Sequence, residues 1–79
     1  MSSNPKVTYK KAKKVALYLG YENKSPGGTS HKQYKHPKTG RKATIPNYGN
    51  DEYGMDLVSS VARQLGLSKK KFYILIRKV

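Results

Sequence analysis

The sequence contains no cysteine, no tryptophan and only 4 aspartate and glutamate residues among 79. Without cysteine the chain can form neither a disulfide framework nor a zinc site of the cysteine type. The scattered carboxylates and 2 histidines are poor material for a metal cage. We therefore expect no metal and no other cofactor, and any chemistry must come from the side chains themselves.

Long apolar runs are also missing. No apolar stretch approaches the roughly 20 residues of a membrane-spanning helix, and the first six residues lack the apolar segment of a signal peptide. These absences predict a small soluble protein of the cytoplasm. We expect one domain over residues 1–79, near the lower size limit for a core without disulfides or metals.

Positive charge is what the sequence has in excess. The 17 lysine and arginine residues give a formal net charge of +13 at pH 7. Such an excess favours nucleic acid as partner, through contacts to phosphates and release of counterions. A membrane surface would require a large apolar helix face, and in a protein this small the core needs that face. We expect no membrane contact, while an acidic protein partner stays compatible with the charge.

Periodicity and turn residues predict three helices and three short strands. The helices are expected over residues 9–19, 55–65 and 69–77, and the strands over residues 21–24, 30–36 and 41–45. Thr8 and Ser68 are suitable N-caps, whereas Gly20 and Gly66 suit helix ends. Residues 38–40 read as a hairpin turn and residues 47–54 as a polar loop.

Helical spacing also predicts the core. The expected buried side chains of the helices are Ala12, Val15, Ala16, Leu19, Val58, Val61, Ala62, Leu65, Phe72, Leu75 and Ile76. In the strand over residues 30–36, alternation places Lys32, Tyr34 and His36 on one face and His31, Gln33 and Lys35 on the other. Tyr34 is expected to pack inward with Ala43 and Ile45. His31 is then predicted to lie on the face that the helices leave open.

The order helix, three strands, helix, helix indicates an α+β fold with helices on one face of an antiparallel sheet. It is similar to the double-stranded-RNA-binding domain, here with a short C-terminal helix. Its central runs are Gly28-Thr29-Ser30-His31-Lys32-Gln33-Tyr34-Lys35-His36-Pro37, Thr44-Ile45-Pro46, and Gly54 followed by residues 57–68. With these runs the sequence resembles the HicA family of toxin–antitoxin mRNA interferases over roughly residues 8–72.

The resemblance implies an endoribonuclease that cleaves mRNA, with His31 as catalytic residue and a HicB-type acidic antitoxin as silencing partner. Imidazole chemistry agrees, because a histidine can take or give a proton near neutral pH. One departure is Thr29, which stands where the family usually has glycine. If that glycine lets RNA approach the backbone closely, Thr29 is expected to weaken the activity.

The cations nearest to His31 in the sequence or across the hairpin are Lys32, Lys35, Arg41 and Lys42. They are expected to stabilise the charge of the phosphate during cleavage. Lys10 and Lys14, on the outer face of the first helix, are also predicted to bind RNA. Ser30 and His36 are secondary candidates, although the parity of the strand favours a structural role for His36.

Two other functions stay open at this point. One is a non-catalytic RNA- or DNA-binding module of the same fold, in which His31 is one more contact. The other is an adaptor whose basic face binds an acidic protein. Among the tyrosines, Tyr34 is expected in the core, whereas Tyr48 and Tyr53 in the polar loop are candidates for stacking on a base.

Overall fold

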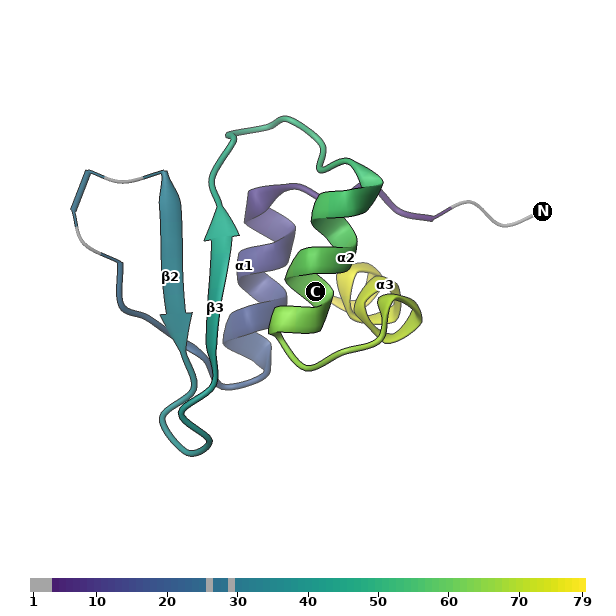
Figure 1. The fold of residues 1–79 in the computed structure, drawn as a ribbon. Helices are drawn as coiled ribbons and strands as arrows, with labels where there is room; N and C mark the ends of the chain where they lie inside the picture. The colour runs from purple at the N-terminus through teal and green to yellow at the C-terminus, as the bar shows by residue number, and fades with distance from the viewer. Residues whose placement is uncertain (1–3, 26, 29) are drawn as a thin grey trace.

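The computed structural model describes residues 4–25, 27–28 and 30–79. Its elements are α1 (Tyr9–Tyr18), β1 (Glu22–Asn23), β2 (His31–Lys35), β3 (Lys42–Pro46), α2 (Met55–Gln64) and α3 (Lys69–Lys78) (Figure 1). Every predicted element is present, and each boundary lies within one residue of its predicted position. Thr29, the departure from the family pattern, lies outside the described residues.

The sheet is antiparallel, with the strand order β1-β2-β3. β2 pairs with β3 from His31 opposite Pro46 to Lys35 opposite Lys42. Figure 1 shows α1 and α2 beside β3, with α3 on the far side of these helices from the sheet. The predicted α+β arrangement of the double-stranded-RNA-binding-domain type is therefore confirmed. In the described part of the chain, no helix is long and apolar enough to cross a membrane.

One hydrophobic cluster holds the helices against the inner face of the sheet. Tyr34, Ala43 and Ile45 are buried on that face, as the alternation predicts. The hydroxyl groups of Tyr34 and of Tyr9 on α1 lie 2.8 Å apart, which ties β2 to the helix layer. All the predicted helical core positions are buried except Leu19, which is partly buried.

The helix ends follow local signals in the sequence. Gly20 has a φ of 98°, and its N–H donates to the Leu17 carbonyl while the N–H of Tyr21 donates to the Ala16 carbonyl. This left-handed ending suits glycine, because a Cβ is strained at positive φ. Ser68 caps α3 by accepting a hydrogen bond from the N–H of Lys71. Thr8 occupies the N-cap position of α1, but its side chain makes no capping hydrogen bond.

The outer edge of β3 is covered by α2, a contact that periodicity did not predict. The Thr44 N–H donates to Oε1 of Gln64 at 2.9 Å, and Nε2 of Gln64 lies 3.5 Å from the Thr44 carbonyl oxygen. Two residues further along β3, Pro46 has no N–H, and its carbonyl accepts a hydrogen bond from the Tyr53 hydroxyl. Side chains thus satisfy backbone groups that an exposed edge strand would offer to another chain.

Candidate functional site

His31 is the first residue of the central strand β2, and its side chain is exposed. Tyr34 faces the core, so alternation puts His31 on the opposite, open face, as predicted. Just before it, the carbonyl of Ser30 accepts a hydrogen bond from the Asn47 N–H at 2.6 Å. The entry to β2 is thereby fixed against the loop that leaves β3, and a substrate can reach the imidazole from the open face.

The pairing of the strands organises this open face into three rows. His31 and Pro46 form the first row, and Lys24, Gln33 and Thr44 the second, where the Lys24 N–H donates to the Gln33 carbonyl. The third row contains Glu22, Lys35 and Lys42. Lys35 and Lys42 are therefore on the same face as His31, four residues or ~13 Å further along the strand.

A hollow of about 350 Å³ lies on the sheet beyond His31. Its lining includes three lysines and two uncharged polar residues of the second and third rows, namely Lys24, Lys35, Lys42, Gln33 and Thr44. A carboxylate borders it at β1, where Oε1 of Glu22 lies 3.2 Å from Nζ of Lys24. The open face thus combines a histidine at one end with a basic hollow that can hold phosphate groups.

Lys32 and Arg41 lie away from this face. Lys32 is partly buried and alternates to the side of Tyr34, where it pairs with Ile45. Arg41 lies at the hairpin end, where a Cβ on Gly66 would come 3.3 Å from its Cζ. Gly66 follows α2, and a cation is favoured at the C-terminal end of a helix. Arg41 therefore contacts the end of α2, a position that sequence spacing did not indicate.

The Tyr21 hydroxyl lies at the same end of α2 and donates to the Leu65 carbonyl at 3.2 Å. Burial raises the pKa of Tyr21, and the charge of Arg41 partly opposes this increase. The guanidinium thus acts on a buried phenol at the junction of sheet and helix. Arg41 thus lies at the hairpin end of the sheet, whereas His31 is at the opposite end of β2.

His36 is held at both ring nitrogens within the hairpin. Its Nδ1 accepts from the N–H groups of Lys38 at 3.2 Å and Thr39 at 3.4 Å. The remaining nitrogen, Nε2, therefore carries the proton of the neutral ring and donates to the Leu19 carbonyl at 3.1 Å. The ring also packs edge-on against Tyr21, with centroids 5.2 Å apart. His36 joins the hairpin turn to the end of α1.

Lys10 and Lys14 are exposed on the side of α1 opposite its buried residues. Because α1 packs on the inner face of the sheet, the helix and the sheet lie between these lysines and His31. The structure brings His31, Lys35 and Lys42 to one face, and Ser30 directly precedes His31 in the chain. It does not bring Lys10 or Lys14 there.

The two loop tyrosines differ in exposure. Tyr53 is buried, its N–H donates to the Val7 carbonyl, and its hydroxyl donates to the Pro46 carbonyl. The prediction that Tyr53 stacks on a base is therefore wrong. Tyr48 is 49% exposed, and its ring meets that of Tyr53 at a centroid distance of 6.2 Å. It stays available at the end of the sheet where His31 lies.

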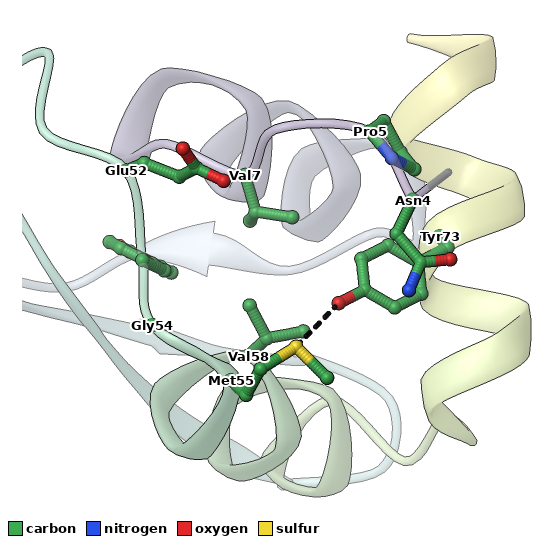
Figure 2. Close-up of a pocket in the computed structure, with 9 residues that line it drawn as sticks. Asn4, Pro5, Val7, Glu52, Gly54, Met55, Val58 and Tyr73 are labelled. Carbon is green, nitrogen blue, oxygen red and sulfur yellow. Dashed lines mark hydrogen bonds between the residues drawn. The ribbon is translucent and has the colours of Figure 1, made fainter.

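A second cleft, of about 390 Å³, lies between the N-terminal segment, the start of α2 and α3. Figure 2 shows Glu52 and Met55 on its rim and the hydrogen bond from the Tyr73 hydroxyl to the Met55 sulfur, 3.6 Å long. Of the candidate residues named from the sequence, Tyr53 lines this cleft, whereas His31 and the predicted RNA-binding lysines and arginine do not. Among the described residues, no group of three or more His, Cys, Asp or Glu side chains is placed to hold a metal ion.

Comparison with known protein families identifies a match over most of the chain. The family model described as the HicA toxin of bacterial toxin–antitoxin systems matches residues 9–67, which covers the sheet, α1, α2 and the position of His31. No curated protein matches the chain. The family match ends before α3 begins.

Proposed function

The chain belongs to the HicA family of toxins from bacterial toxin–antitoxin systems, and from this premise we propose that it is a metal-independent endoribonuclease that cleaves mRNA. The observation that carries the proposal is the place of His31. It is the exposed first residue of the central strand, on the sheet face that also presents Lys35 and Lys42. Proton transfer and phosphate binding are thereby available on one accessible surface.

His31 acts in this proposal as the general acid or base. Cleavage of RNA by its own 2′-hydroxyl requires loss of the hydroxyl proton and delivery of a proton to the leaving 5′-oxygen. An imidazole can serve either transfer near neutral pH, with a typical acceleration of about 10²–10⁴-fold. Lys35 and Lys42 bind the flanking phosphates, and long-range attraction to the net charge of +13 brings the RNA to the protein.

The proposed protein partner is an acidic antitoxin of the HicB type. Family membership implies an antitoxin, and the basic open face would attract an acidic surface. Expression of the chain alone is expected to arrest bacterial growth, and co-expression of the antitoxin is expected to restore it. Harmless expression of the folded wild type would contradict the toxin role.

The nuclease is tested by incubating purified protein with single-stranded RNA in excess EDTA. Wild type is expected to cleave, whereas His31→Ala is expected to lower the rate at least about 100-fold, because proton transfer is lost. RNA affinity of His31→Ala should stay within a few fold, since lysines supply most phosphate contacts. Lys70→Ala, an exposed position on α3, is the control for the loss of one polar surface side chain.

Three results would contradict this proposal. Intact RNA after incubation with folded wild type would favour the non-catalytic RNA- or DNA-binding module. Equal losses of binding and cleavage in His31→Ala would mean that His31 binds RNA without catalysing its cleavage. Loss of wild-type cleavage in EDTA, with recovery on addition of a divalent cation, would show that the reaction depends on a metal.

A further inference from the structure

The hollow beyond His31 has the composition of a nucleotide subsite. Gln33 lies in its second row, two residues or ~7 Å along β2 from His31, which is close to the length of one extended nucleotide. Lys35 and Lys42 lie one further step of ~7 Å along. A single strand running along β2 would thus meet the histidine, an amide and a lysine pair in that order.

The lysine pair favours an anion at the far end of the hollow. Lys35 and Lys42 are directly opposite each other in the register, and both are exposed. The alternation of hydrogen bonds makes this a non-hydrogen-bonded pair, whose Cα atoms lie ~4.5 Å apart. Like charges in such a pair destabilise a sheet, and a phosphate between the ammonium groups would remove that repulsion.

The β1 side of the hollow is less favourable for phosphate. Glu22 lies in the same row as Lys35 and forms an ion pair with Lys24. Its negative charge repels a phosphate from this edge and offsets the charge of Lys24. The phosphate is therefore favoured between Lys35 and Lys42, and the base is left over the second row.

Gln33 is well placed to contact that base. Its side chain is exposed on the hollow, while its backbone N–H donates to the Ser25 hydroxyl oxygen at 2.7 Å. Its backbone carbonyl accepts a hydrogen bond from the Lys24 N–H, also at 2.7 Å. The strand is thus rigid where the amide projects, and an amide offers both donors and an acceptor to a base edge.

We propose that this hollow binds the nucleotide next to the cleaved bond, with Gln33 selecting its base and Lys35 and Lys42 holding its phosphate. The inference rests on the proposed ribonuclease function, since that function defines which bond is cleaved. Thr44, opposite Gln33 in the register, completes the floor as a small hydroxyl contact. Base selection in this subsite does not require the proton transfer by His31.

Binding is tested in the His31→Ala protein, so that RNA stays intact. The probes are four labelled homopolymeric oligoribonucleotides, followed by fluorescence anisotropy. The His31→Ala protein is expected to bind the four oligonucleotides with different affinities. Adding Gln33→Ala is expected to reduce the ratio of the highest to the lowest affinity by about 5- to 100-fold. Gln33→Asn keeps the amide on a shorter side chain and should retain part of the affinity difference between the four bases.

Substitution of the lysines is expected to change RNA affinity without changing base preference. Lys35→Gln together with Lys42→Gln should weaken all four oligonucleotides equally. The slope of log affinity against log salt should fall by about 0.7 for each phosphate that the protein no longer neutralises. Lys69→Gln with Lys70→Gln on α3 removes the same charge far from the hollow and is expected to have a smaller effect on both readouts.

The cut sites of wild type and of Gln33→Ala on RNA of random sequence complete the test. Gln33→Ala should still cleave, with a relaxed base preference beside the cut. Equal affinity of the His31→Ala protein for the four homopolymers would overturn the proposed subsite. Affinity differences that Gln33→Ala leaves unchanged would also overturn it. If the affinity differences depend on Gln33 but the wild type does not cleave RNA, the subsite is retained and the proposed nuclease function is rejected.

Discussion

At the scale of single residues, the two histidines occupy contrasting surroundings. His31 is exposed on the open face, whereas His36 binds the hairpin turn through Nδ1 and the end of α1 through Nε2. The sequence predicted this contrast, because residues an odd number of positions apart in a strand point to opposite faces of the sheet. The partners of His36 were not predictable, since Leu19 is 17 residues away and meets it only after the sheet and helix pack.

His36→Ala is expected to lower the free energy of unfolding by about 0.5–1.5 kcal/mol, because the partly buried Leu19 carbonyl loses its hydrogen-bond partner. His36→Asn should lose less, since its side-chain oxygen can still accept from the turn N–H groups of Lys38 and Thr39. Urea denaturation measures both losses. Loss of RNA cleavage by folded His36→Asn, without a matching loss of stability, would assign His36 to the reaction instead.

At the scale of elements, helix and strand boundaries were predictable because their signals are local. Gly20, Gly66 and Ser68 mark helix ends within a few residues of the turns they terminate or begin. The packing of Gln64 against β3 and the burial of Tyr53 were not predictable. Gln64 meets Thr44 across 20 residues, and Tyr53 lies in a loop of polar composition that conceals its hydrogen bonds to the N-terminal segment and to β3.

Gln64→Ala tests the attachment of α2 to the sheet edge. The substitution leaves the N–H and carbonyl of Thr44 without their side-chain partner, and the expected loss is about 1–2 kcal/mol of unfolding free energy. The uncovered edge should also promote self-association at high concentration, measured by light scattering. Gln64→Glu can accept from Thr44 but cannot donate, so it should fall between wild type and Gln64→Ala. Equal stability of all three would show that the edge contact contributes nothing.

At the scale of the whole molecule, charge is distributed unevenly over the fold. α1 carries four lysines and α3 carries five lysine and arginine residues, and neither helix contains an acidic residue. The two helices pack together, which brings these two basic elements close to each other. Repulsion among these charges opposes folding, and screening by salt should reduce it. Composition predicted the excess charge, while the contact between these two basic helices became evident only from the packing.

The same chain should lose stability in alkali through its buried tyrosines. Burial raises the pKa of Tyr34 and of Tyr53 above the ordinary value near 10, and the hydrogen bond to Tyr9 raises that of Tyr34 further. The unfolded chain therefore releases these protons first. The stabilisation is fully present below pH ~10 and is lost as the pH rises toward the folded-state values, by ~1.4 kcal/mol per pH unit for each tyrosine.

Lysines lose their charge in the same pH range, and the resulting relief of repulsion acts in the opposite direction. The decisive measurement is therefore a difference: urea denaturation of wild type and Tyr34→Phe at several pH values above 10. Removing the Tyr34 hydroxyl should make the decline shallower by ~1.4 kcal/mol per pH unit, because one shifted group no longer titrates. Tyr18→Phe makes the same chemical change at a position that is 57% exposed and serves as the matched control. Parallel curves for wild type and Tyr34→Phe would show that the buried Tyr34 hydroxyl does not limit the stability of the fold in alkali.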